Sequence, residues 1–220
     1  MARDASETRE KLLRAAEHLF ARYGLDVPIR EIHKVAGQRN ASAIQYHFGS
    51  KEELLAAIIE RHAPTPEAMA EVRADLEARQ HDPRSFVEAI VRRLSGYLAA
   101  PETRDYIRFS FHLMMRSSMR AVLARGSEHH SMAAVYAETD LVRSMFPTLP
   151  ERLVRERAVA GISFITLQVA ERARLIDDVP PEEGALLDEE EFIDNLVDMA
   201  TAVLTASTSG KTSSATGERT

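Results

Sequence analysis

Helical periodicity runs through almost the whole of this 220-residue chain, and no other feature restricts its fold as much. Apolar residues recur every three or four positions in nearly every periodic stretch. No segment alternates apolar and polar residues as a half-buried strand would. Glycines and prolines interrupt the pattern at intervals that suit helix ends. The sequence therefore predicts an all-α fold.

Four short helical stretches occupy the first sixty or so residues. We expect helices over residues 6–23, 29–36 and 41–47, and a fourth that starts at Ser50. Ser50 and Glu53 have the spacing of a capping box, which marks the start of that fourth helix. A longer helix followed by two short ones, joined by a tight turn with a glycine, is the frame of a helix-turn-helix. We therefore expect a three-helix helix-turn-helix domain over residues 1–62.

The third of these stretches has the composition of a helix that reads DNA. Small residues let the backbone approach a duplex, and polar side chains supply donors and acceptors for base edges and phosphates. A lysine at the start of the next helix suits a phosphate. The predicted DNA-binding residues are Arg39, Asn40, Ala41, Ser42, Gln45, Tyr46, His47 and Lys51. Two alternatives remain open: Tyr46 as a packing residue with only its hydroxyl exposed, and His47 as a cap of the helix.

The charge distribution separates this first domain from the rest of the chain. The net charge is −6, which taken alone argues against binding to nucleic acid. Residues 1–62 hold ten Lys and Arg against nine Asp and Glu, so the excess of acid lies beyond them. We expect a larger helical domain over residues 63–206 with a different partner, and a disordered Ser/Thr/Gly-rich tail over 207–220.

Helices of the second domain are expected over residues 66–80, 84–99, 102–125, 128–145, 150–175 and 188–206. The last two are apolar over more than one face, so each has one face for its own core and another for a partner. We expect these helices to pair in a homodimer. The predicted dimerisation residues are Ala158, Ile162, Ile165, Val169, Phe192, Leu196, Met199 and Val203.

The middle of the chain carries a cluster of aromatic residues, methionines and two polar side chains on one expected helix. One interpretation is the wall of a small-molecule pocket, in which Arg108 or His112 binds a polar group of the ligand. The other is ordinary core, with methionines filling gaps and the arginine reaching outward. The candidate ligand residues, including some on neighbouring helices, are Tyr97, Arg108, Phe109, His112, Met115, Phe164 and Gln168.

Several classes of function find no support in the sequence. The absence of cysteine excludes disulfides and thiolate metal sites. His129 and His130 are adjacent and point about 100° apart on a helix, which favours a solvated helix start over a metal site. No signal peptide, membrane span, nucleophile elbow or phosphate loop is present, so we expect a cytoplasmic protein that is not an enzyme and needs no cofactor.

The ordered motifs of residues 8–60 resemble those of the tetracycline-repressor (TetR) family. The matching segments are Thr8–Ala16, Leu19-Phe20 with Tyr23-Gly24, Ile29–Ile32, Ala36-Gly37 and Tyr46–Leu54. Two differences accompany the resemblance. The turn Gln38–Asn40 is one residue longer than in the commonest family pattern, and His33 replaces a small residue. Base contacts are therefore not transferred from the family to single residues here.

The resemblance implies that residues 63–206 form a ligand-binding and dimerisation domain. It also implies a dimer that places two reading helices in successive major grooves of a palindromic operator, about 34–36 Å apart. An unknown small-molecule effector would bind the second domain and release the protein, which would act as a repressor. The alternative is a helical dimer that binds a small molecule or a protein and has no DNA-binding activity.

Overall fold

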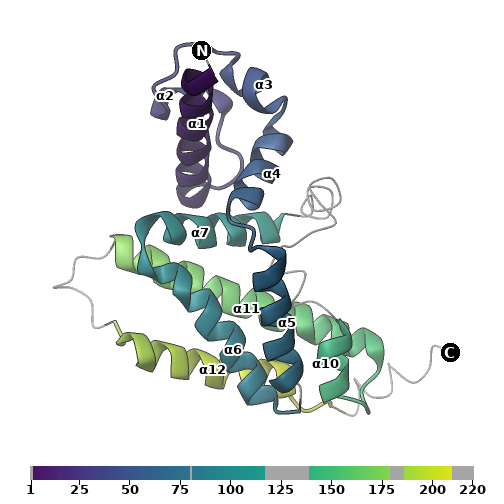
Figure 1. The fold of residues 1–220 in the computed structure, drawn as a ribbon. Coiled ribbons are helices and arrows are strands. Elements are labelled where there is room, and N and C mark those ends of the chain that lie inside the picture. Colours follow the sequence, from purple (N-terminus) through teal and green to yellow (C-terminus); the bar gives the residue numbers. More distant parts are fainter. Residues whose placement is uncertain (1, 80, 117–138, 179–185, 210–220) are drawn as a thin grey trace. The chain divides into compact units, whose positions relative to one another are not determined.

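The computed structural model describes residues 2–79, 81–116, 139–178 and 186–209, and within these ranges every regular element is a helix (Figure 1). This confirms the predicted all-α class. The elements are α1 (Ala2–Tyr23), α2 (Ile29–Val35), α3 (Ala43–Phe48), α4 (Lys51–Arg61), α5 (Pro66–Arg79), α6 (Pro83–Ser95), the short 3₁₀ helix η1 (Gly96–Ala99), α7 (Pro101–Met115), α10 (Thr139–Met145), α11 (Glu151–Asp178) and α12 (Glu189–Thr205).

The chain divides into two compact units. The first contains the residues up to Pro64 together with segments 97–131 and 169–179, and the second contains segments 65–96, 132–168 and 180–220, as far as the structure describes them. Helix α7 thus belongs to the same unit as α1–α4, although it lies far beyond residue 62 in sequence.

The core of the first unit forms where α1 meets α2, α3, α4 and α7. Leu12 and Phe20 of α1 are fully buried there, as are Ile32 of α2 and Leu54 of α4. Phe109 of α7 completes this core, with its ring centroid 6.2 Å from that of Phe20. Burying an aromatic side chain of this size contributes roughly 1.5–3 kcal/mol, so α7 is an integral part of the core around α1.

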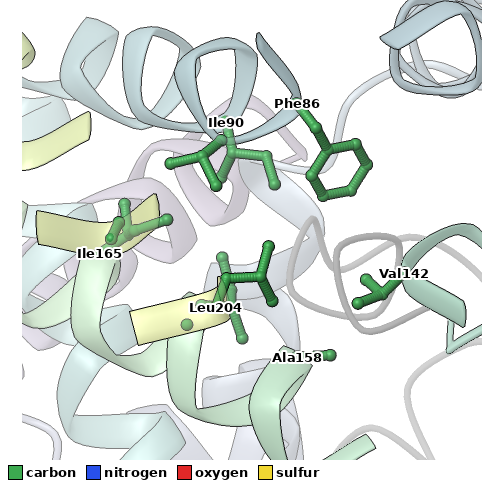
Figure 2. A pocket seen from close by; sticks show the side chains of 10 residues that line it. Phe86, Ile90, Val142, Ala158, Ile165 and Leu204 are labelled. Atoms are coloured by element: carbon green, nitrogen blue, oxygen red, sulfur yellow. The ribbon is translucent and has the colours of Figure 1, made fainter. Parts of the chain in front are cut away.

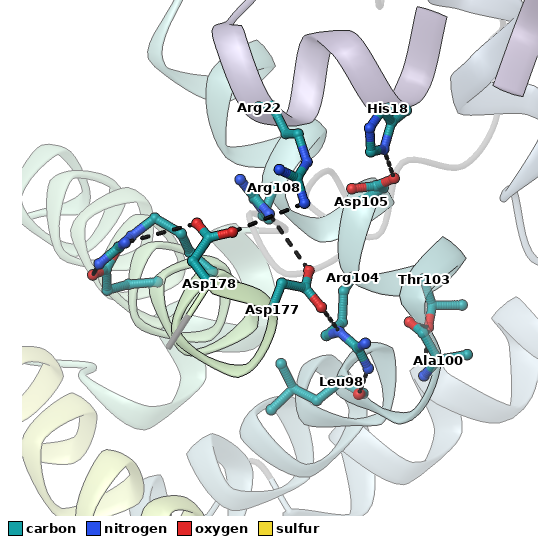
Figure 3. A network of polar contacts seen from close by, with 12 residues as sticks. His18, Arg22, Leu98, Ala100, Thr103, Arg104, Asp105, Arg108, Asp177 and Asp178 are labelled. Atoms are coloured by element: carbon teal, nitrogen blue, oxygen red, sulfur yellow. Dashed lines mark hydrogen bonds and ion pairs between the residues drawn. The ribbon is translucent and has the colours of Figure 1, made fainter. Parts of the chain in front are cut away.

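Ion pairs add to the apolar contacts of this unit (Figure 3). Asp177, near the end of α11, accepts from Arg104 at 2.7 Å and lies 3.5 Å from a nitrogen of Arg108. These side chains are largely buried, so the carboxylate offsets the cost of removing two guanidinium groups from water. His18 of α1 pairs with Asp105 of α7 at 2.7 Å.

The second unit is built on contacts between α6 and α12. Ile90 and Val91 of α6 and Leu196 and Val197 of α12 are all buried. Arg92 pairs with Glu190 across the two helices, which adds only a solvent-exposed contact. Asp188 begins α12 as a capping box with Glu191.

One predicted helix is wrong in length. Residues 102–125 were expected to form a single helix, but α7 ends at Met115 because Arg116 has extended backbone angles of φ −92° and ψ 127°. The remainder of that stretch, the start of the helix expected over 128–145, His129-His130 and most of the tail lie outside the described residues. No helix within the described ranges is long and apolar enough to cross a membrane.

Candidate nucleic-acid interface

Helix α3 is held to its neighbours along one face. Ala43 and Ile44, at its start, are 4% and 2% exposed and pack into the core of the first unit. The backbone N–H of Ile44 donates to Nε2 of His33, a buried side chain of α2, at 3.3 Å. His33 therefore ties the start of α3 to α2, a role that a small side chain at this position would not perform.

The opposite face of α3 carries polar side chains into solvent. Gln45 and Tyr46 are exposed, and Tyr46 is 79% exposed, which excludes the packing alternative for its ring. His47 is half-buried beside Tyr46, with the ring centroids 4.9 Å apart. Gly49, at φ +84°, ends the helix by donating its N–H to the carbonyl of Gln45, so His47 is not the cap.

The residues before α3 extend this polar surface. Arg39, Asn40, Ala41 and Ser42 are all exposed. Asn40 has a defined orientation, because its Oδ1 accepts from the backbone N–H of Ser42 at 2.9 Å. Seven of the eight predicted DNA-binding residues thus lie on the turn before α3 or on α3 itself.

Lys51 is the exception among them. Its Nζ donates to the carbonyl oxygen of Val27 at 2.8 Å and lies 5.4 Å from the centre of the Phe20 ring. Burial lowers the pKa of this ammonium. Lys51 therefore stabilises the backbone of the loop that precedes α2, and its side chain is turned inward from the position expected for a phosphate contact. Ser50 caps α4 as predicted, because its Oγ accepts from the N–H of Glu53 at 3.0 Å.

The structure does not bring the predicted ligand residues together. Phe109 is fully buried in the core around α1, and Arg108 is buried beside Asp177. Burial lowers the pKa of His112 of α7, whose ring N–H donates to the backbone carbonyl of Ala21. Met115 is 57% exposed. Tyr97 lies beside Tyr106 in the same unit, with ring centroids 5.4 Å apart.

Phe164 and Gln168, the other two candidates, are half-buried on the part of α11 that belongs to the second unit. Of the two interpretations of this cluster, the structure favours ordinary core, because α7 packs Phe109 and Leu113 against α1. Periodicity showed that α7 had an apolar face, but it could not show which element that face would contact.

A cavity lies instead inside the second unit (Figure 2). The empty space of this cavity, including its opening to solvent, is about 320 Å³. The cavity is narrow, because the centre of a water molecule can occupy only about 20 Å³ of it. Every lining residue is apolar, and the walls come from α6, α10, α11 and α12: Phe86, Val87, Ile90, Val142, Ala158, Gly161, Ile162, Ile165, Ala200 and Leu204. None of the seven predicted ligand residues is among them.

Most of the predicted dimerisation residues are already buried within one chain. Ala158, Ile162, Ile165 and Val169, which were expected to face a partner, are each at most 7% exposed within one chain. Leu196 of α12 is likewise buried. The predicted residues Phe192 and Val203 are half-buried, and Met199 is 37% exposed.

Apolar side chains nevertheless remain exposed on both helices. Val159 and Leu167 of α11 are 48% and 40% exposed, and neither was among the predicted dimerisation residues.

The N-terminal residues match a known family. Residues 12–58 match the model of the bacterial regulatory proteins of the tetR family. The chain is 32% identical over 97 residues to the HTH-type transcriptional repressor NicS of Pseudomonas putida, an alignment that covers 44% of each chain. It is 45% identical over 51 residues to the HTH-type transcriptional dual regulator CecR of Shigella flexneri, covering 23% of this chain and 22% of that protein. The chain thus matches less than half the length of these curated relatives.

Solved structures extend the likeness of fold to most of the chain. The crystal structure of NalD, the secondary repressor of the MexAB-OprM multidrug efflux pump in Pseudomonas aeruginosa, aligns with a TM-score of 0.53 at 20% identity, covering 89% of this chain and 96% of NalD. The fatty acid degradation regulator FadR from Bacillus halodurans aligns with a TM-score of 0.50 at 12% identity, covering 90% and 95%.

The family consists of transcriptional regulators and not of enzymes. Its motifs coincide with the elements that position the exposed polar face of α3: Phe20 and Ile32 in the core, and Ser50 at the cap of α4. On this evidence residues 12–58 form a helix-turn-helix domain of the tetR family of bacterial regulatory proteins.

Proposed function

We propose that this protein is a ligand-responsive transcriptional regulator that binds a palindromic operator as a homodimer and acts as a repressor. The observation that carries the proposal is the two-sided construction of α3. Ala43, Ile44 and the hydrogen bond to His33 fix one face, while Gln45 and Tyr46 on the other are free to meet base edges. Arg39 and Ser42 supply further donors beside them.

Dimerisation is proposed through the exposed apolar side chains of α11 and α12. Val159, Leu167 and Met199 belong to the second unit and leave apolar area in water in the single chain. Burying such area at about 25 cal/mol per Å² favours association, and the same patch on a second copy would form an isologous interface. This reassigns the interface to the face of α11 that the chain itself leaves uncovered.

The apolar cavity between α6, α10, α11 and α12 is the proposed effector site. Its lining offers no charged or polar side chain, so an effector would bind through its hydrocarbon part. Because the cavity is narrow, an effector would have to move its walls apart. It could release the protein from DNA only if it bound the widened arrangement more tightly than the narrow one. The relative NicS is a repressor by name, which supports repression as the outcome.

The direct test is a mobility-shift titration with the DNA upstream of the protein's own gene, at two salt concentrations. We expect specific retardation that weakens as salt increases. The double variant Arg39→Ala with Gln45→Ala should lose discrimination between this DNA and a scrambled duplex, while light scattering still reports a dimer. Arg93→Ala is the matched control, because it removes an exposed arginine of α6 from the second unit.

Absence of specific retardation by the parent protein would contradict the proposal. It would favour the alternative of a helical dimer without DNA-binding activity. Unchanged discrimination in the double variant would instead move the reading surface away from α3.

A further inference from the structure

The loop between α1 and α2 is held at its start by a side chain of α7. The last four carbonyl groups of a helix have no partner within the helix. Ala21 lies in the last turn of α1, and its carbonyl accepts from a ring N–H of His112. The His112 ring also packs against the end of α1, because its Nδ1 lies 3.8 Å from the place that a Cβ on Gly24 would take. His112 therefore fixes the point at which the chain leaves α1.

The other end of this loop is held by two cations. Arg116, directly after the last residue of α7, pairs with Asp26. Lys51 of α4 donates to the carbonyl of Val27 at 2.8 Å. Burial lowers the pKa of Lys51, Arg116 lowers it further and Asp26 raises it, which is the pattern of three charges that lie close together. Side chains from α4 and from the end of α7 thus hold the loop in place.

The position of the loop determines where α2 begins. Pro28 follows Val27 and is the N-cap residue of α2, with its φ of −66° fixed by the ring. Helix α2 has only seven residues, and its buried side chain His33 accepts from the backbone N–H of Ile44 at the start of α3. A displacement of the loop would therefore reach α3 through one short helix.

We propose that His112 and Arg116 are positioning residues for the reading surface of α3, which act through the loop and α2 rather than by contact with DNA. The inference rests on the proposed DNA-binding function and extends it to residues far beyond the helix-turn-helix in sequence. Three links act in series: α7 to the loop, the loop to α2, and α2 to α3. Because a series fails when any one link is broken, breaking a second link should add little.

A purely structural role of these side chains would have a different effect. If His112 and Arg116 only stabilised the fold, variants that stay folded at the assay temperature would keep the parent's preference between two DNA sequences. The informative quantity is therefore discrimination, which is the affinity for the upstream DNA divided by the affinity for a scrambled duplex. It is measured well below the Tm of every variant, which thermal unfolding establishes.

The first test measures discrimination by the full-length protein with fluorescence anisotropy. His112→Phe keeps an aromatic ring but removes the donor, whereas His112→Gln keeps an N–H donor. We expect discrimination to fall about fivefold in His112→Phe and to stay near the parent value in His112→Gln.

The pair with Asp26 is tested by exchanging its charges. Arg116 is 43% exposed, so Arg116→Glu leaves the core intact. It should lower discrimination about fivefold, and Asp26→Arg in the same chain should restore most of it. Arg84→Glu is the matched control, because it breaks an exposed pair with Asp198 in the second unit and should leave discrimination unchanged.

The series is tested by breaking its last link together with its first. His33→Leu removes the acceptor of the Ile44 N–H and should lower discrimination about fivefold on its own. Effects of substitutions at separate sites ordinarily multiply to within about twofold. Combined with His112→Phe, His33→Leu should nevertheless lower discrimination about fivefold, in place of the roughly 25-fold expected for independent sites.

Three results would overturn the inference. Parental discrimination in both His112→Phe and Arg116→Glu would mean that these residues only stabilise the fold, and it would leave the proposed function standing. No recovery on adding Asp26→Arg to Arg116→Glu would mean that the pair does not act on the reading surface. Losses that multiply when His33→Leu is combined with His112→Phe would show two separate effects. A parent protein without preference between the duplexes contradicts the proposed function itself, which is a separate outcome.

Discussion

Replacing Gly161 by alanine should stabilise this protein, because the structure leaves space for the added methyl group. Gly161 is buried in the middle of α11, yet a Cβ built there meets no heavy atom within 4 Å apart from its chain neighbours and the adjacent backbone of its own helix. Alanine is favoured over glycine in a helix interior by about 1 kcal/mol. A methyl group that enters the apolar cavity adds up to about 0.8 kcal/mol. The expected gain is therefore about 1–2 kcal/mol.

Thermal unfolding is the assay, and for a chain of this size a gain of 1 kcal/mol raises Tm by about 2–4 °C. Gly96→Ala is the matched control, because Gly96 is exposed, has right-handed helical angles and also has open space at its Cβ. The stability of Gly96→Ala should increase only because the unfolded chain loses conformational freedom. Gly24→Ala should do the opposite and lose about 1–2 kcal/mol, since Gly24 has φ +78°.

The comparison between these variants decides the argument. If Gly161→Ala is no more stable than Gly96→Ala, the added methyl group gains nothing from the cavity. If it is less stable than the parent, the space beside Gly161 is absent in solution and the account of the cavity is wrong.

Three further predictions concern the first unit. Phe109→Ala should lower the free energy of unfolding by about 3–5 kcal/mol in urea titrations, and a loss below about 1 kcal/mol would contradict its place in the core around α1. Asp177→Asn should destabilise by about 2–3 kcal/mol, because Arg104 and Arg108 lose their carboxylate; an unchanged Tm would mean that the pair contributes nothing. Burial lowers the pKa of His112 below its unfolded value of 6.5, so the unfolded chain binds the proton first as the pH falls. Stability should decrease as the pH drops from 6.5 toward the lower folded pKa, and His112→Gln should show less of that decrease when unfolding is measured between about pH 5 and 7.5.

The local elements of the N-terminal helices were accessible from the sequence. The apolar spacing of Leu12, Ala16 and Phe20 and the glycine at position 24 give the buried face and the end of α1. Ser50 and Glu53 give the start of α4. These features depend on residues within a few positions of each other, so periodicity and capping rules suffice to predict them.

Long-range choices were not accessible in the same way. Phe109 has the same apolar character whether it lines a pocket or packs on Phe20, and the partner lies almost ninety positions away in sequence. Lys51 looks like a phosphate ligand until the fold brings the carbonyl of Val27 within 2.8 Å. The contacts of Phe109 and Lys51 depend on which helices and loops pack together. The apolar pattern of a single helix does not contain that information.

The two apolar rows of α11 show the same limit. Periodicity indicates that both the row of Ile162 and the row of Val159 are apolar, but only packing decides which row the chain itself covers. The chain covers the Ile162 row completely, and of the other row it covers Thr166, Ala170 and Ala173 but leaves Val159 48% exposed. For the same reason the sequence did not reveal the open groove lined by Thr8 of α1 and Asn40 of the turn before α3, because it exists only where these two segments come together.

The measurement that tests the central claim most directly is the binding of the full-length protein to the DNA upstream of its own gene, compared with a scrambled duplex of equal length at two salt concentrations. The parent should prefer the upstream DNA at both, with affinity that falls as salt rises, and the variant with Arg39→Ala and Gln45→Ala should bind the two duplexes equally. Equal affinity of the parent for both duplexes, or no binding to either, would contradict the assignment of α3 as the element that reads DNA.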